Sequence, residues 1–149
     1  MPEEDVVREI ANKFQEQGYG MVLACSFVDE NERIMTRCFS TVSKEDVVAV
    51  LSRVSANISQ LDYDNQGIIA GAIVVETETK KLSAMVQEAA ITLDFAEPMI
   101  VSCVSGGEFA SFAVGDAPML VFMTVKLLVS MNQFGTPTFN PMTFDMNPN

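Results

Sequence analysis

The sequence contains no histidine and no tryptophan, and it has only nine lysine and arginine residues against twenty aspartates and glutamates. Without histidine, Ser-His-Asp and Cys-His catalytic arrangements are excluded, and the commonest metal ligand is missing. The formal charge of -11 would repel a phosphate backbone, and Lys80-Lys81 is the only cluster of basic residues in the sequence. Direct nucleic-acid binding is therefore not expected.

Long apolar runs are also missing. The longest, Met119 to Val129, contains Thr124 and Lys126 and falls short of the roughly 20 residues that a membrane-spanning helix needs. The first residues are acidic rather than basic, so no secretory signal and no membrane association are predicted. Three cysteines without a Cys-x-x-Cys pair are interpreted as reduced, buried, apolar side chains, which favours a cytoplasmic location: Cys25, Cys38 and Cys103.

The bulk composition is that of a folded chain. Hydrophobic residues make up 48% and charged residues 19% of the 149 residues, a length that fits one domain. We predict a single α/β domain over residues 1–133 and a flexible Phe-, Pro- and Asn-rich tail over residues 134–149. The alternative for the tail is a Phe-anchored arm that docks on a neighbouring chain.

The first half of the sequence predicts a helix, a hairpin and a second helix. Apolar residues at helical spacing indicate a helix over Pro2 to Gln17, closed by Gly18. Strand-forming residues over Met21 to Val28 and Arg33 to Val42 flank a polar turn and indicate a β-hairpin. Ser43 is a suitable N-cap for the next helix, which we expect to end near Ser59 and to be followed by a polar connection over Gln60 to Gln66.

The second half predicts the same order of elements after one ambiguous segment. The apolar run Ile68 to Val75 fits a strand or a helix, and its spacing with later residues favours a helix that could break near Thr77 to Thr79. A helix is expected over Lys80 to Leu93. Met99 to Ser105 and Glu108 to Gly115 flank Gly106-Gly107, which indicates a hairpin with a two-residue turn. Asp116 can cap a last helix over about Ala117 to Asn132, closed by Gly135.

These elements define an α/β (α+β) fold with an antiparallel sheet of about four strands from two hairpins, and with helices mainly on one face. Met21 to Cys25 aligns with Met99 to Cys103, and Phe39 to Val48 aligns with Phe112 to Val121. The matches suggest an internal helix-hairpin-helix repeat. The alternative is that two apolar hairpins resemble each other by chance.

The second half of the chain is poor in charge. From Leu82 to Asn149 it has seven charged side chains in 68 residues, and the last helix is apolar on nearly every side. Such a helix lies in a core or at an interface, so we predict a homo-oligomer in which the last helix and the hairpin over Met99 to Gly115 lie near the contact. The candidate interface residues are Met119, Phe122, Met123, Leu127, Met131, Phe134, Phe139 and Phe144.

No catalytic, cofactor-binding or metal-binding residue is predicted. Asp62 and Asp64 lack the remaining ligands of an EF-hand, Gly106-Gly107 belongs to no phosphate-binding motif, and Cys25 lies in a strand of apolar neighbours. The expected function is therefore non-enzymatic: a protein-protein interaction or regulatory module that binds itself and another, basic protein. The alternatives are a structural subunit of a larger assembly, such as a viral particle, and an acidic inhibitor that mimics nucleic acid to block a basic groove.

Overall fold

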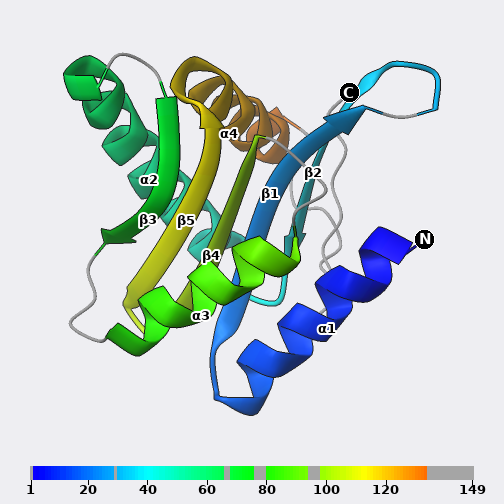
Figure 1. Cartoon of the computed structure of the whole chain (residues 1–149), viewed down its shortest axis with the longest axis vertical. Helices are drawn as coiled ribbons and strands as arrows, with labels where there is room; N and C mark the ends of the chain where they lie inside the picture. The colour runs from blue at the N-terminus through cyan, green and yellow to red at the C-terminus, as the bar shows by residue number, and fades with distance from the viewer. Residues whose placement is uncertain (1, 29, 66–67, 76–79, 94–97, 134–149) are drawn as a thin grey trace.

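The computed structural model of the chain describes residues 2–28, 30–65, 68–75, 80–93 and 98–133. Within these ranges all five strands form one antiparallel sheet in the order β2-β1-β4-β5-β3 (Figure 1). The helices and strands, in chain order, are α1 (Pro2–Glu16), β1 (Gly20–Val28), β2 (Ile34–Ser40), α2 (Lys44–Asn65), β3 (Ile68–Val75), α3 (Lys80–Thr92), β4 (Met99–Ser105), β5 (Glu108–Asp116) and α4 (Ala117–Gln133).

Local signals in the sequence set most of the element ends. Gly18 follows α1 with a φ of 81°, in the left-handed region that glycine adopts at low cost after a helix. The Asp46 backbone N–H donates a hydrogen bond of 3.2 Å to Ser43 Oγ, which confirms Ser43 as the N-cap of α2. Ser105 pairs with Glu108 across Gly106-Gly107, and Gly106 has a φ of 61°. The predicted two-residue hairpin turn is therefore confirmed.

The preference for a helix over Ile68 to Val75 was wrong. This segment is the edge strand β3, and it pairs with β5 along its whole length, from Ile68↔Asp116 to Val75↔Phe109. Backbone pairing with a distant strand decides its conformation, which a short apolar run without a clear period does not encode. The sheet consequently has five strands instead of about four. The expected break near Thr77 to Thr79 lies outside the described residues.

The connection after α2 was also predicted wrongly. α2 continues to Asn65, so the expected polar loop over Gln60 to Gln66 is largely the last turns of this helix. Gln60 and Leu61 are good helix formers, and no glycine or proline interrupts the chain between Ser43 and Asn65, so the helix continues although Asp62, Asp64 and Asn65 have low helix propensity.

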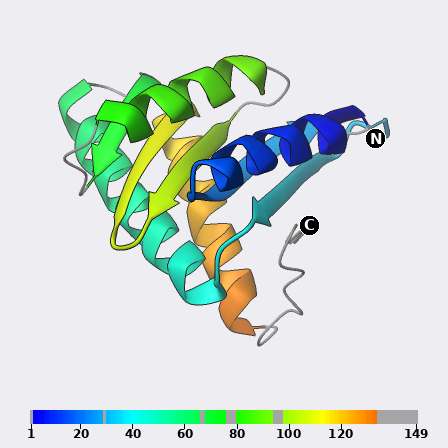
Figure 2. The ribbon, with the colours of Figure 1, turned by 90° about the horizontal axis from the view of Figure 1, so that it is seen from below.

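Helices cover both faces of the sheet, which corrects the expectation that they lie mainly on one face (Figure 2). α1 and α3 pack on one face, where their apolar residues form a cluster with Leu23, Val101 and Cys103. α2 and α4 pack on the other face, around Val22 and Ile100. The reason is topological: β2 and β3 are opposite edges of the sheet, so α2 crosses one face, and α3 returns to the centre over the other.

β1 and β4 are neighbours in the sheet, and their register is symmetric with respect to the two aligned sequence segments. Leu23 lies opposite Val101, while Met21 lies opposite Cys103 and Cys25 opposite Met99. If each residue of β1 is replaced by its aligned residue of β4, and the reverse, the same set of pairs results. A local two-fold axis between Leu23 and Val101 would produce this relation. A duplication as the origin of this relation stays a prediction.

Candidate functional site

The side of α4 that faces the sheet belongs to the core. It packs against α2 and the strands β1, β2 and β5. The hydroxyl of Thr124 on this side donates a hydrogen bond of 2.8 Å to the Val121 carbonyl oxygen of the same helix. The spacing of three or four residues between buried positions is that of one helix face. The buried residues of this side are Ala117, Leu120, Met123, Thr124, Leu127, Ser130 and Met131.

The outer side of α4 is apolar as well. Met119 is 49% exposed, Phe122 67%, and Val125 and Val129 46% each. We call these four residues the α4 stripe. Their spacing of three, three and four residues places them along one line about 15 Å long, at 1.5 Å rise per residue. Among the residues whose exposure the structure describes, the other large and exposed apolar side chain is Ile91 on α3, which stands alone and needs no functional explanation.

Helix α2 serves as a comparison for α4, because the two helices occupy equivalent positions in the fold. α2 and α4 each follow a hairpin, pack on the same face of the sheet, and have matching buried positions when Lys44 is aligned with Ala117. At the outward positions α2 has polar or small residues where α4 has the stripe. The α2 residues at the positions of Met119, Phe122, Val125 and Val129 are, in the same order, Asp46, Ala49, Ser52 and Ala56. A helix at this position of the fold therefore does not need apolar residues on its outward side, and the stripe is specific to α4.

A pocket of about 370 Å³ lies beside the stripe. On one side are the hydroxyls of Ser26 and Thr36, buried and joined by a hydrogen bond of 3.1 Å. The other walls come from Pro98 and from the first half of α4, including Met119 and Phe122. Lys126 also lines the pocket, and its ammonium group lies 5.9 Å from the centre of the Phe122 ring, within the range of a cation–π interaction.

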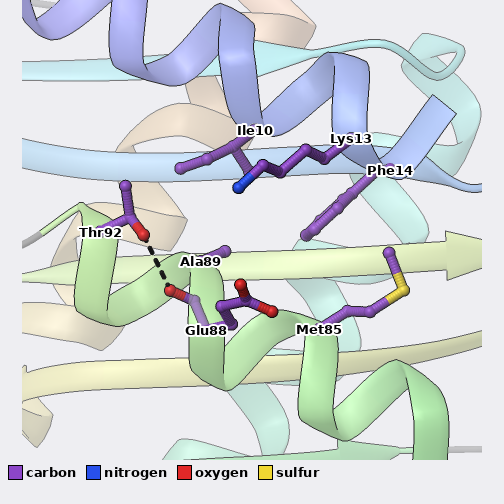
Figure 3. Close-up of a pocket in the computed structure, with 7 residues that line it drawn as sticks. All are labelled: Ile10, Lys13, Phe14, Met85, Glu88, Ala89 and Thr92. Atoms are coloured by element: carbon purple, nitrogen blue, oxygen red, sulfur yellow. Dashed lines mark hydrogen bonds between the residues drawn. The ribbon is translucent and has the colours of Figure 1, made fainter. Parts of the chain in front are cut away.

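Two further pockets are less suited to a partner. One of about 50 Å³ lies between α1 and α3, with Ile10, Phe14 and Met85 among its lining residues. Figure 3 shows Lys13 and Glu88 reaching this pocket from the two facing helices. Its volume is close to that of one or two water molecules, and the exposed positions around it are mostly polar. The other, of about 290 Å³, lies between α2 and the Gly106-Gly107 turn.

The structure separates the candidate interface residues into three groups. Met119 and Phe122 are on the surface, whereas Met123, Leu127 and Met131 are core residues of the α2/α4 face. As buried side chains these three cannot contact a partner directly. Phe134, Phe139 and Phe144 lie outside the described residues. Val125 and Val129 were missed, although their helical spacing from Phe122 would have found them once the outward side of the helix was known.

The hairpin that was expected near the contact is in the middle of the sheet. β4 pairs with β1 and β5, and β5 pairs with β4 and β3. Neither strand offers a free edge, and helices cover both of their faces. A partner can therefore reach this hairpin only at its Gly106-Gly107 turn, so α4 itself is the better candidate.

The three cysteines are buried, and none of them forms a disulfide. Burial raises the pKa of the Cys103 thiol from 9.0 to about 12, because an apolar environment disfavours the thiolate. Within the described ranges, no group of three or more histidine, cysteine, aspartate or glutamate side chains could hold a metal ion. The helices of the same ranges are all too short or too polar to cross a membrane.

The fold and this surface define an α/β protein with one exposed apolar helix face. No protein family, curated protein or solved structure matches the chain.

Proposed function

We propose that this chain is a non-enzymatic, cytoplasmic interaction module that acts as a homo-oligomer, in its simplest form a two-fold dimer joined through the α4 stripe. The observation that carries the proposal is the contrast between the two equivalent helices. α2 presents Ala49 to solvent where α4 presents Phe122. Exposed aromatic and methionine side chains, with few charges around them, are the composition of interface cores.

Charge favours a second copy as the partner. Two chains of formal charge -11 repel each other unless they meet through a face that carries few charges. In α4 the only charged residue is Lys126. A basic partner would instead be attracted to acidic positions such as Asp5, Glu9 and Glu16, which are exposed on α1 at the opposite face of the sheet. The regulatory contact with another protein is therefore proposed there, and it leaves the dimer intact.

Area limits what the stripe can do alone. Four side chains that are about half exposed present a few hundred Å² of apolar surface, whereas a standard interface takes roughly 800 Å² from each partner. The stripe is thus proposed as the centre of the contact. Additional surface must come from neighbouring parts of the chain.

Light scattering over a micromolar concentration range tests the proposal. We expect a mass twice that of the 16.3 kDa chain, and a dimer that becomes tighter when salt is raised from about 0.05 to 0.5 M, because salt screens the repulsion between two acidic chains. A 16.3 kDa monomer at every concentration contradicts the proposal. Masses well above a dimer would favour a structural subunit, and a monomer that binds a basic protein only at low salt would favour an acidic inhibitor.

A further inference from the structure

The pocket of about 370 Å³ beside the α4 stripe lies at the end of the sheet where β4 begins and β5 ends. α4 starts directly after β5, so its first turns form one wall of this pocket, and β1 and β2 contribute another. We call it the α4 pocket. Its volume is in the range of sites that take small organic molecules. The residues that line it are Ser26, Thr36, Pro98, Pro118, Met119, Phe122, Met123 and Lys126.

The α4 pocket has a buried base and an exposed rim. Ser26, Thr36 and Met123 at the base are at most 6% exposed, whereas Met119 and Phe122 are on the surface. Five of the eight lining residues are apolar. Mostly apolar walls with a few polar groups are the usual composition of a site for a small organic ligand.

The two hydroxyls at the base keep one hydrogen atom for a further bond. Ser26 Oγ and Thr36 Oγ1 are 3.1 Å apart, and their mutual bond uses one of the two hydroxyl hydrogens. Among the residues that the structure describes, no acceptor takes the second one. Because buried donors are almost always paired in folded proteins, this hydrogen favours an acceptor atom in the adjoining pocket.

Charge distinguishes the α4 pocket from the other two pockets. Lys13 and Glu88 both reach the pocket between α1 and α3 (Figure 3), and Arg53 and Asp46 both line the pocket of about 290 Å³. The residues lining the α4 pocket include Lys126 and no acidic residue. In a chain with twenty acidic and nine basic residues, a lining of this kind is a local positive site, which attracts anions.

The first turn of α4 acts in the same direction. Pro118 and Met119 of this turn line the pocket, and the positive end of a helix dipole favours an anion close to it. Asp116, immediately before the helix, is exposed and does not line the pocket. Water therefore screens its repulsion of a bound anion.

These groups define the chemistry of the ligand. The ammonium group of Lys126 has three N–H donors, so it can bind a ligand in addition to its contacts within the protein, one of which is the Phe122 ring at 5.9 Å. A cation and a hydroxyl hydrogen require acceptors, and a carboxylate offers two oxygens that accept several hydrogen bonds. The apolar walls require a hydrocarbon part.

We propose that the α4 pocket binds a small amphipathic carboxylate. Lys126 and the hydroxyl pair hold its anionic group, and its hydrocarbon part lies against Met119, Phe122 and Met123. This site goes beyond the proposed dimer and does not depend on it, because all eight lining residues belong to one chain.

Calorimetric titration with octanoate tests the proposal. We expect a dissociation constant on the order of 0.1 mM, a moderate affinity for a ligand of this size. Octanol keeps the hydrocarbon part without the charge and should bind at least about ten-fold more weakly, because a hydrogen bond to a charged group is the stronger kind. Octylammonium and acetate, which lack the negative charge and the hydrocarbon part respectively, should bind more weakly still. Equal affinities for octanoate and octanol, or tighter binding of octylammonium, overturn the proposal.

The role of Lys126 has a matched control in the pocket between α1 and α3. Lys126→Met should weaken octanoate binding about ten-fold, whereas Lys126→Arg should keep it within about two-fold, since a charge-assisted bond needs the cation. Lys13→Met makes the same change of net charge at the other pocket and should leave the affinity unchanged. Equal losses in Lys126→Met and Lys13→Met would mean that general charge, and not this site, attracts the anion, which overturns the proposal.

The hydroxyl pair predicts a non-additive pattern. Ser26→Ala and Thr36→Val each leave one hydroxyl hydrogen in the pocket, so each variant alone should change the affinity for octanoate less than about three-fold. The double variant removes the last hydroxyl donor and should weaken binding about ten-fold or more. Unchanged binding in the double variant overturns the assignment of the carboxylate to this pair.

Methionine methyl signals in NMR spectra locate the ligand in the unaltered chain, so this measurement stands even where a buried variant fails to fold. Octanoate should shift the signals of Met119 and Met123 and leave that of Met85, in the pocket between α1 and α3, in place. A shift confined to Met85, or no shift at all, overturns the site. Light scattering decides separately on the dimer: a monomer that binds octanoate in this way contradicts the dimer alone, and a dimer that binds none contradicts the pocket alone.

Discussion

Phe122 and Met123 are consecutive residues of α4, yet Phe122 is 67% exposed and Met123 is 2% exposed. Successive residues of a helix differ by about 100° in direction, so one points away from the sheet and the other into the core around Leu51 and Ile100. The same helix therefore carries the proposed contact and part of the α2/α4 core, and substitutions at these two positions should separate assembly from folding.

We expect Phe122→Asp to abolish the dimer and to change the free energy of unfolding of the monomer by less than about 0.5 kcal/mol, as at most surface sites. Met123→Ala should cost about 2–5 kcal/mol of that free energy, because it removes a buried side chain and leaves a cavity. Urea denaturation and light scattering measure the two effects. Ala49→Asp, at the equivalent outward position of α2, is the matched control, and loss of the dimer in this variant would contradict the role of the stripe.

The turn between β4 and β5 gives a prediction about two neighbouring glycines. Gly106 has a φ of 61°, whereas a Cβ added at Gly107 meets no atom within 4 Å. Gly106→Ala should therefore lower the free energy of unfolding by about 1–2 kcal/mol, the cost of a left-handed backbone for a residue with a Cβ. Gly107→Ala should stay within about 0.5 kcal/mol of the parent chain in urea denaturation. Equal losses in the two variants would show that the turn has a different geometry.

Most of the fold could be predicted because the sequence marks it locally. The N-cap at Ser43, the glycine after α1 and the Gly106-Gly107 turn each act within a few residues, and all three are confirmed. β3 could not be predicted in this way. Its conformation depends on pairing with β5, which begins more than thirty residues later, and an apolar run of eight residues has no period that would reveal that pairing.

The candidate site was predicted only in part for a similar reason. α4 has apolar residues on both its buried and its exposed side, so the sequence alone does not tell which side faces the core. The face of the sheet on which α4 packs, and the position of α2 beside it, decide that Met123 is inside and Val125 outside.

The thiol of Cys103 gives a pH dependence with a definite sign. Its pKa is about 12 in the folded chain against an ordinary value of 9.0. Above pH 9 the unfolded chain loses this proton while the folded chain keeps it, so ionisation favours unfolding. The stabilising contribution is complete below pH 9 and is lost progressively between pH 9 and 12.

Comparing the parent chain with Cys103→Ala in urea denaturation isolates this group from the lysines and tyrosines that titrate in the same range. We expect the free energy of unfolding of the parent to fall more steeply than that of the variant between pH 8 and pH 10.5. Parallel curves would mean that Cys103 ionises as easily in the folded chain as in the unfolded one. At pH 8 the folded parent should also resist alkylation, since its cysteines are buried.

The end of the chain gives the last prediction. Residues 134–149 contain Phe134, Phe139 and Phe144 at intervals of five, and Asp145 is the only charged side chain among them. If these phenylalanines anchor an arm on a neighbouring copy, deletion of residues 134–149 should raise the dissociation constant of the dimer about ten-fold, equivalent to about 1.4 kcal/mol. The free energy of unfolding should not change. A full-length variant with serine at the three positions should behave like the deletion, because it keeps the chain length and loses only the apolar anchors. A dissociation constant unchanged by both alterations would remove the arm from the contact and favour the simpler expectation of a flexible terminus.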